Sequence, residues 1–413
     1  MENKLNRPHG GELINRVVNG DRRLRELQKA TELKKIKLDD VTTSIVEMIA
    51  IGALSPLTGF MCARDYHSVL RNMYLTNDIV WTVPITLKVT KEFASKVKPG
   101  EKLALCEKNG QILGTIEVED KFKIDQQLEN QLVYQSKNPA LHGSSRKSSE
   151  YKMALGGNIQ LLNRPSSTCS SRYRYDPEQV RKIFADRGWS RIVAFQNPNP
   201  IGSSRESVEK CALDIVDGLF LHPQIIEYEL SGPAVLHQIR KYVVLVQNYY
   251  PPDRIVFSIF PWARFHAGPR EAVLQAIIRQ NFGCSHFIIA EKNLDADDFF
   301  NILDLQRIFN EFPPEDLEIT PILAEQTFYC KKCKAVVTAK ICPHQNDPME
   351  ENRLNNGKTM LAKGSLPPLE FSSHDVFPIL IDELWKVKPR NKIFTSNQNA
   401  VQFNPNLVQF LTG

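Results

Sequence analysis

The sequence lacks long apolar runs. No window of its 413 residues approaches the ~18 apolar residues that a membrane-spanning helix needs. The N-terminal stretch "MENKLNRPHGGELI" also lacks the apolar core of a signal peptide. We therefore expect a cytoplasmic protein with no membrane partner.

Excess charge and a disulfide framework are also missing. Lys and Arg number 52 against 47 Asp and Glu, and the basic residues are spread along the chain, which argues against a nucleic-acid partner. Of eight cysteines, three are clustered and five are scattered, which suits a reducing compartment. The scattered ones are Cys62, Cys106, Cys169, Cys211 and Cys284.

The pattern of short segments changes along the chain. Short β-segments such as "EKLALCE" and "QILGTIEVED", joined by a hairpin-like "KNG", dominate the first part. From about residue 173, strands such as "RIVAFQ" alternate with helices such as "AVLHQIRKYVVLVQNYY", which favours a parallel sheet with crossover helices. We predict domains at 1–168, 169–325 and 326–390, and an Asn/Gln-rich tail at 391–413.

One turn in the second part raises a question about chemistry. The stretch "FQNPNPIGSSRE" follows a strand and precedes a helix, where α/β proteins bind phosphate groups at the helix N-terminus. It contains no Lys or His, and Arg205 is its one basic residue. The position is typical of an anion site, but the side chains are not.

Several long segments carry a family resemblance. They include "PHGGELINRVV", "VEMIAIGALSPLTGFM", "KCALDIVDGLFLHP" and "AGPREAVLQAIIRQNFGCSHFII", and the match covers nearly the whole chain. The sequence resembles the ATP sulfurylases, the sulfate adenylyltransferases that convert ATP and sulfate to adenylylsulfate and pyrophosphate. The resemblance implies an α/β protein with a PUA-like β-rich N-terminal domain, a Rossmann-like nucleotidyltransferase domain and a small C-terminal domain.

The family's catalytic turn, Q-T-R-N-P-x-H-R-A-H, falls on the turn quoted above. By resemblance its Gln and Arg hold sulfate and its two His stabilise the ATP phosphates. Gln196 and Asn199 match the pattern. The Arg position holds Pro198, and the two His positions hold Gly202 and Arg205.

Other phosphate-facing positions also depart from the family. The family stretch G-R-D-H-A-G-V-G is "AEKNLDAD" here, with Glu291 and Asn293 in place of an Arg and a His. Phe265 stands where M-R-Y-A-G-P-R-E has its Arg. The Lys of V-G-x-T-K and the Arg of S-G-T-K-V-R-E-M-L are also missing. Each lost cationic contact removes roughly 2–4 kcal/mol of transition-state stabilisation.

The surviving residues allow two interpretations. Gln196, Asn199 and Arg205 are residual catalytic ligands, or the two amides satisfy backbone groups of the turn. Gly268, Pro269 and Arg270 of "AGPREA" still accept adenine or ribose, or they only begin a helix.

A Cys/His cluster is the strongest remaining chemical signal. Cys330, Cys333, Cys342 and His344 have the types and short spacings of a structural zinc site, and some ATP sulfurylases carry a similar cluster. The alternative is a set of free thiols, and His344 is the least certain ligand because it lies only two residues after Cys342.

Three functions follow from the resemblance. The favoured one is an inactive or impaired family member that acts as a binding or regulatory subunit, as a homo-oligomer or together with an intact paralogue. The second is an active sulfate adenylyltransferase using ATP and Mg²⁺ with a rearranged site built on Arg205, Arg264 and Lys292. The third is a sensor of ATP or another adenine nucleotide.

Overall fold

The structure is a computed structural model, and its described residues form two compact units. The described ranges are 5–134, 151–166, 171–196, 203–225, 232–262, 265–290, 302–325, 327–330 and 332–344. Unit 1 draws on 1–168, 175–191 and 261–323, and unit 2 on 169–174, 192–260 and 324–413. Within the described ranges, no helix has both the length and the apolar character needed to cross a bilayer.

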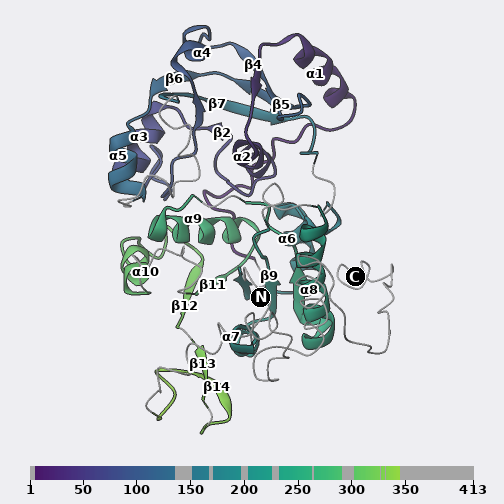
Figure 1. The fold of residues 1–413 in the computed structure, drawn as a ribbon, viewed down its shortest axis with the longest axis vertical. Helices are drawn as coiled ribbons and strands as arrows, with labels where there is room; N and C mark the ends of the chain where they lie inside the picture. Colours follow the sequence, from purple (N-terminus) through teal and green to yellow (C-terminus); the bar gives the residue numbers. More distant parts are fainter. Residues whose placement is uncertain are drawn as a thin grey trace, which may run out of the picture. The chain divides into compact units, whose positions relative to one another are not determined.

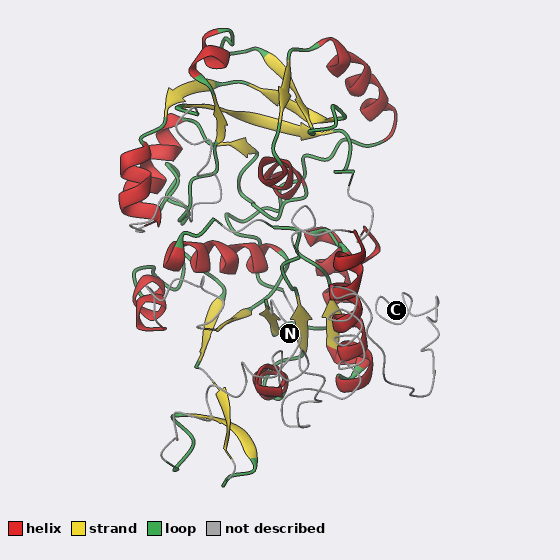
Figure 2. Ribbon diagram, viewed as in Figure 1, coloured by secondary structure: helices red, strands yellow, loops and turns green. Residues whose placement is uncertain are grey.

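Unit 1 is built around a seven-stranded sheet (Figures 1 and 2). Its main path runs β1-β4-β5-β7-β2, and β3 and β6 also pair with β7. The predicted hairpin is confirmed, because β4 and β5 pair antiparallel. The strands are β1 (Lys35–Lys37), β2 (Gly59–Phe60), β3 (Leu87–Val89), β4 (Lys102–Cys106), β5 (Ile112–Glu117), β6 (Asp120–Lys123) and β7 (Met153–Leu161).

Strand β7 is the centre of this sheet and owes its close packing to glycine. It pairs with β2, β3, β5 and β6. Gly157 has a φ of 146°, and a Cβ there would lie 2.0 Å from the carbonyl oxygen of Glu117. Only a residue without a side chain fits this crossing of strands.

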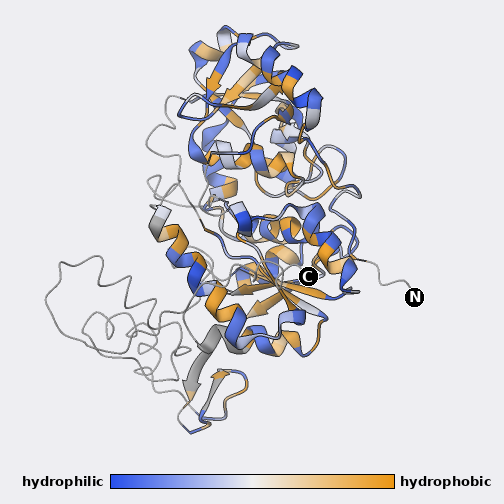
Figure 3. Cartoon of the chain, turned by 90° about the vertical axis from the view of Figure 1, so that its right-hand side faces the viewer, coloured by the Kyte–Doolittle hydropathy of each residue, from blue (hydrophilic) through white to orange (hydrophobic). Residues whose placement is uncertain are grey.

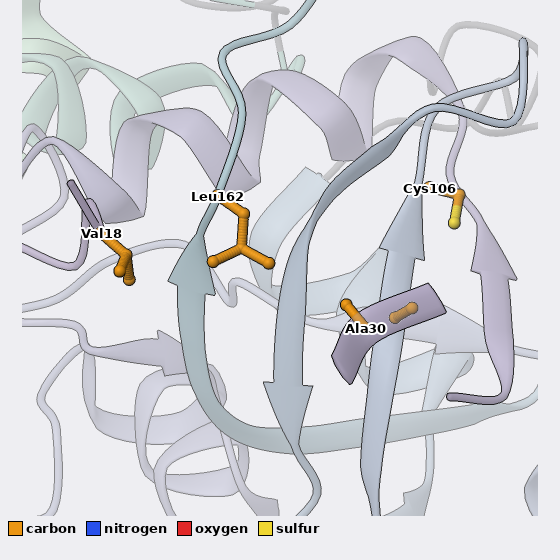
Figure 4. Close-up of a cluster of buried hydrophobic side chains, with 5 residues drawn as sticks. Val18, Ala30, Cys106 and Leu162 are labelled. Carbon is orange, nitrogen blue, oxygen red and sulfur yellow. The ribbon is translucent and has the colours of Figure 1, made fainter. Parts of the chain in front are cut away.

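Helices cover the sheet and join it through small apolar clusters. One cluster brings together Val18, Ala30, Cys106 and Leu162 from four segments of the unit (Figure 4). The helices of this part are α1 (Gly20–Glu32), α2 (Asp40–Ala50), α3 (Ala63–Asn72), α4 (Lys91–Ser95), α5 (Gln126–Glu129) and the π-helical turn η1 (Asn130–Tyr134).

Unit 1 also contains segments from later in the chain. An Asp-Pro pair begins α6, and the N–H of Asp176 donates to Gln179 Oε1 at 2.8 Å. Helix α9 is buried along nearly its whole length, so even its polar residues need internal partners. These segments are α6 (Pro177–Asp186), α9 (Gly268–Asn281), β11 (His286–Ala290), α10 (Ile302–Phe309) and β12 (Thr320–Ala324).

Unit 2 contains three parallel strands in the order β10-β9-β8. All residues of these strands are buried, and all except Gly218 are strongly apolar. Their apolar colouring is visible in Figure 3. This confirms the predicted alternation of buried strands with helices. The elements are η3 (Ser171–Tyr173), β8 (Ile192–Phe195), α7 (Ser203–Leu213), β9 (Gly218–Leu221), α8 (Gly232–Tyr249), η5 (Pro252–Arg254), β10 (Ile255–Phe257), β13 (Thr327–Cys330) and β14 (Ala335–Thr338).

Candidate functional site

The carboxyl ends of the parallel strands in unit 2 bring the candidate site together. Phe195 at the end of β8 pairs with Leu221 at the end of β9. The residues after β9 continue the pairing beyond the strand ends. The N–H of His222 donates to the carbonyl of Phe195 at 3.0 Å, and Gln224 forms an isolated β-bridge with Phe260. Ligands of open α/β sheets bind at this edge.

Two glutamine side chains meet at this edge. Gln196 directly follows β8 and is 9% exposed, and its Nε2 donates to Gln224 Oε1 at 2.6 Å. A buried amide needs such a partner, so Gln224 fixes the orientation of Gln196. Sequence reasoning missed Gln224, because the pairing comes from the register of two strands and not from spacing along the chain.

His222 lies under the same edge as a packing residue. Its side chain is 1% exposed, and its ring lies 4.4 Å from that of Phe220 and 4.9 Å from that of Phe260. These contacts make His222 part of the apolar core beneath the edge.

Helix α7 opens directly after the candidate turn. Pro198, Asn199 and Gly202 lie outside the described residues. The helix begins at Ser203, so Arg205 is in its first turn, although its side chain is not among those described. The predicted strand–turn–helix context is therefore present at both ends of the turn.

Contacts with the end of α8 anchor the middle of α7. Glu209 is fully buried, and the hydroxyl of Tyr250 donates to its carboxylate. Lys210 Nζ lies 5.8 Å and 5.7 Å from the ring centroids of Tyr249 and Tyr250. A buried carboxylate held by a hydroxyl fixes this turn of the helix.

The second candidate segment lies in unit 1, at the start of α9. Gly268 is the first helical residue, with a φ of 52°, and Pro269 follows in the first turn. The carboxylate of Glu271 accepts the N–H groups of Phe265 at 3.1 Å and Ala267 at 3.2 Å. Glu271 therefore closes the turn that precedes the helix.

Arg270 points into the protein and binds backbone. Its guanidinium donates to the carbonyls of Val69 and Leu70 at 3.2 Å and 3.1 Å, while the Thr82 hydroxyl donates to the Arg270 carbonyl at 2.5 Å. Burial lowers the pKa of this 8% exposed guanidinium. These hydrogen bonds give Arg270 a structural role inside unit 1. The nucleotide-binding role of Gly268, Pro269 and Arg270 stays a prediction.

Phe265 occupies the position where the resemblance places a phosphate-facing Arg. Its ring packs against Trp262, with centroids 5.1 Å apart. An aromatic side chain held in this way offers no cation to a phosphate. The residues Arg264, Glu291, Lys292 and Asn293 lie outside the described ranges.

The four predicted metal ligands come together in unit 2 around the β13–β14 hairpin. Their donor atoms all lie within 4.8 Å of one another. His344 Nδ1 is 3.3 Å from Cys333 Sγ, 3.6 Å from Cys330 Sγ and 3.8 Å from Cys342 Sγ. The least certain predicted ligand, His344, thus faces all three sulfurs.

These separations fit a tetrahedral metal ion. With metal–sulfur bonds of ~2.3 Å, the sulfur–sulfur edges of the tetrahedron measure about 3.8 Å, close to the 3.9 Å between Cys333 Sγ and Cys342 Sγ. The N–H of Cys333 also donates to Cys330 Sγ at 3.4 Å, which lowers the pKa of the Cys330 thiol. Three sulfurs and one imidazole leave no open position for catalysis.

Comparison with known proteins agrees with this architecture. A PUA-like domain family matches residues 6–164, and a family described as ATP-sulfurylase matches residues 171–383. The predicted fold class is confirmed.

Named relatives match over nearly the full length. A sulfate adenylyltransferase of Nostoc punctiforme is 41% identical over 371 residues, covering 89% of this chain and 94% of its own. One from Synechococcus sp. strain JA-3-3Ab is 39% identical over 379 residues, covering 91% and 96%. A solved structure of a hexameric APS kinase from Thiobacillus denitrificans shares the fold with a TM-score of 0.71 at 24% identity, covering 91% of this chain and 68% of its own. The chain therefore belongs to the ATP sulfurylase, or sulfate adenylyltransferase, family.

Proposed function

We propose that this protein is a catalytically impaired member of its family that keeps the scaffold and acts as a binding or regulatory subunit. The observation that carries the proposal is the loss of cations at the phosphate-facing positions. Pro198, Gly202 and Phe265 stand where the family pattern has Arg, His and Arg. None of the three side chains can neutralise a phosphate oxygen.

The substitutions affect side chains that would bind phosphate and leave the apolar core unchanged. Transfer of an adenylyl group requires charge on phosphate oxygens to be stabilised by fixed cations and donors. At roughly 2 kcal/mol or more for each lost contact, three losses reduce the rate by about 10⁴-fold or more. The apolar strands of unit 2 remain buried, as a folded binding domain requires.

The environment of Phe265 supports the same conclusion. Its backbone N–H is bound by Glu271 and its ring is packed on Trp262. Phe265 is therefore part of the local packing and supplies no positive charge in place of the family's Arg.

An active enzyme with a rearranged site is the main alternative. It would use Arg205, Arg264 and Lys292 as substitute cations. The test is pyrophosphate release from ATP, Mg²⁺ and sulfate by the purified protein. Turnover that disappears in Arg205→Ala would establish the alternative and overturn our proposal, whereas no turnover in either protein supports the proposal.

A nucleotide sensor is the third candidate. A ligand that binds only the folded state raises the melting temperature. A thermal-shift series with ATP, ADP, AMP and adenylylsulfate distinguishes the candidates, because a sensor requires a shift with at least one of them. No shift with any nucleotide removes the sensor hypothesis.

We also propose that Cys330, Cys333, Cys342 and His344 bind a structural Zn²⁺. The donor set and the separations given above support this assignment. Metal analysis of the purified protein should give about one zinc per chain, and Cys330→Ser should lose it. An intact zinc content in Cys330→Ser, or no zinc in the wild-type protein, would favour free thiols.

A further inference from the structure

Helix α7 contacts two different structures within unit 2. It contacts β8 and β9 of the parallel sheet, and it also contacts β13 and β14 of the Cys/His hairpin. Figure 1 shows the hairpin next to this helix. The same helix begins at Ser203, directly after the candidate catalytic turn.

The hairpin has little core of its own. It consists of two four-residue strands, and Ile341 beside it is 68% exposed. Among its described side chains, Cys330 and Val337 are buried. An isolated two-stranded hairpin is at best marginally stable in water, so the metal ligands must supply most of its order.

One ion pair closes the hairpin at its base but does not replace a metal. Lys340 Nζ lies 2.5 Å from Glu325 Oε1, with the lysine side chain 77% exposed. Exposed ion pairs of this kind contribute little to stability, because solvent screens them. The geometry of the surface that α7 contacts therefore depends on the Cys/His cluster.

We infer that the metal-loaded hairpin positions helix α7, so that metal occupancy sets the order of the helix that opens the candidate site. The inference rests on the metal site proposed above, not on whether the protein turns over. Glu209 and Tyr250 hold the middle of the helix against α8. The hairpin supplies a second support, and its loss frees the helix to fray.

The test is amide hydrogen exchange on the full-length protein, with and without zinc, after metal content has been measured. Removal of zinc by a chelator should accelerate exchange in peptides covering Ser203–Leu213 by about tenfold or more. Peptides covering Gly268–Asn281 in unit 1 serve as an internal reference and should exchange at an unchanged rate.

Two variants separate the metal effect from a general effect of cysteine loss. Cys342→Ser should reproduce the exchange of the chelated protein. Cys211→Ser removes an exposed cysteine on α7 itself, outside the cluster, and should exchange like the zinc-loaded wild type. If Cys342→Ser does not fold, hydrogen exchange of the chelated wild-type protein still tests the inference.

Three results would overturn the inference. The first is loss of zinc and of hairpin protection with unchanged protection of α7. The second is equal acceleration in the α7 and α9 peptides, which would indicate general unfolding. The third is a purified protein that neither contains zinc nor binds it on addition. The pyrophosphate assay is independent of all three, so failure here and failure of the proposed function are distinguishable.

Discussion

At the scale of single residues, Arg270 illustrates how a side chain that resembles a ligand can serve the core. Its guanidinium is buried and donates to two carbonyls of the segment around Val69. Removing the guanidinium would leave them without this donor.

Arg270→Met keeps the length of the side chain and removes its donors. We expect it to lower the free energy of unfolding by about 2–4 kcal/mol, measured by urea denaturation. Arg307→Met is the matched control, because Arg307 is 77% exposed and pairs only at 3.8 Å with Asp304, so it should change stability by less than ~0.5 kcal/mol. An Arg270→Met protein with wild-type stability and a lost nucleotide-induced thermal shift would show that Arg270 is a ligand.

Glu26 provides a residue-level prediction for pH. Hydrogen bonds from Lys102 at 2.8 Å and Lys29 at 2.9 Å lower its pKa from 4.5 to about 2. A depressed carboxyl pKa stabilises the fold above pH ~4.5, and this stabilisation is lost as the pH falls toward ~2. The side chain is partly solvated, so its contribution at neutral pH is about 1 kcal/mol or less.

Glu26→Gln should therefore lower the free energy of unfolding at pH 7 and lose this difference from wild type near pH 2. Denaturant titrations at pH 7, 4 and 3 measure the trend. Glu32→Gln, which removes an exposed carboxylate from the same helix, is the matched control. A Glu26→Gln difference that is constant across these pH values would contradict the assignment.

At the scale of elements, β7 holds unit 1 together by letting four strands approach it. We expect Gly157→Ala to cost about 3 kcal/mol or more, since its Cβ would lie 2.0 Å from a backbone oxygen that cannot easily move. Gly11 also has a positive φ, of 95°, but a Cβ there would meet no atom within 4 Å. Gly11→Ala should therefore lower the free energy of unfolding by only about 1–2 kcal/mol. Equal melting temperatures for the two variants would contradict the account of this crossing.

Elements with local signals were predictable from the sequence. The polar turn between β4 and β5 depends on neighbouring residues, and the predicted hairpin is confirmed. The Asp-Pro pair that begins α6 is a local signal of the same kind. The pairing of Gln196 with Gln224 depends on the register of β8 and β9, which no local pattern encodes. The carbonyl contacts of Arg270 span 200 residues of sequence and were not predictable for the same reason.

The position of the candidate site was predictable from the sequence, but the hydrogen bonds between its residues were not. The family pattern located the turn after β8. Residue types and spacing located the four ligands of the Cys/His cluster, which the structure brings together. The role of Glu271 in closing the turn before α9 was missed, although a carboxylate in the first turn of a helix is a recognisable signal.

At the scale of the whole molecule, the chain keeps the two matched domains of its family. Relatives near 40% identity are named sulfate adenylyltransferases, so the scaffold is shared with enzymes of that name. We therefore propose that the fold is retained and that the cationic contacts to phosphate are lost.

The most direct test is a parallel measurement of pyrophosphate release by this protein and by the 41% identical sulfate adenylyltransferase of Nostoc punctiforme. Both are assayed at saturating ATP, Mg²⁺ and sulfate. Our account predicts a rate at least ~10⁴-fold below that of the relative, as expected for three lost cationic contacts. A rate within about tenfold of the relative, abolished in Arg205→Ala, would contradict it.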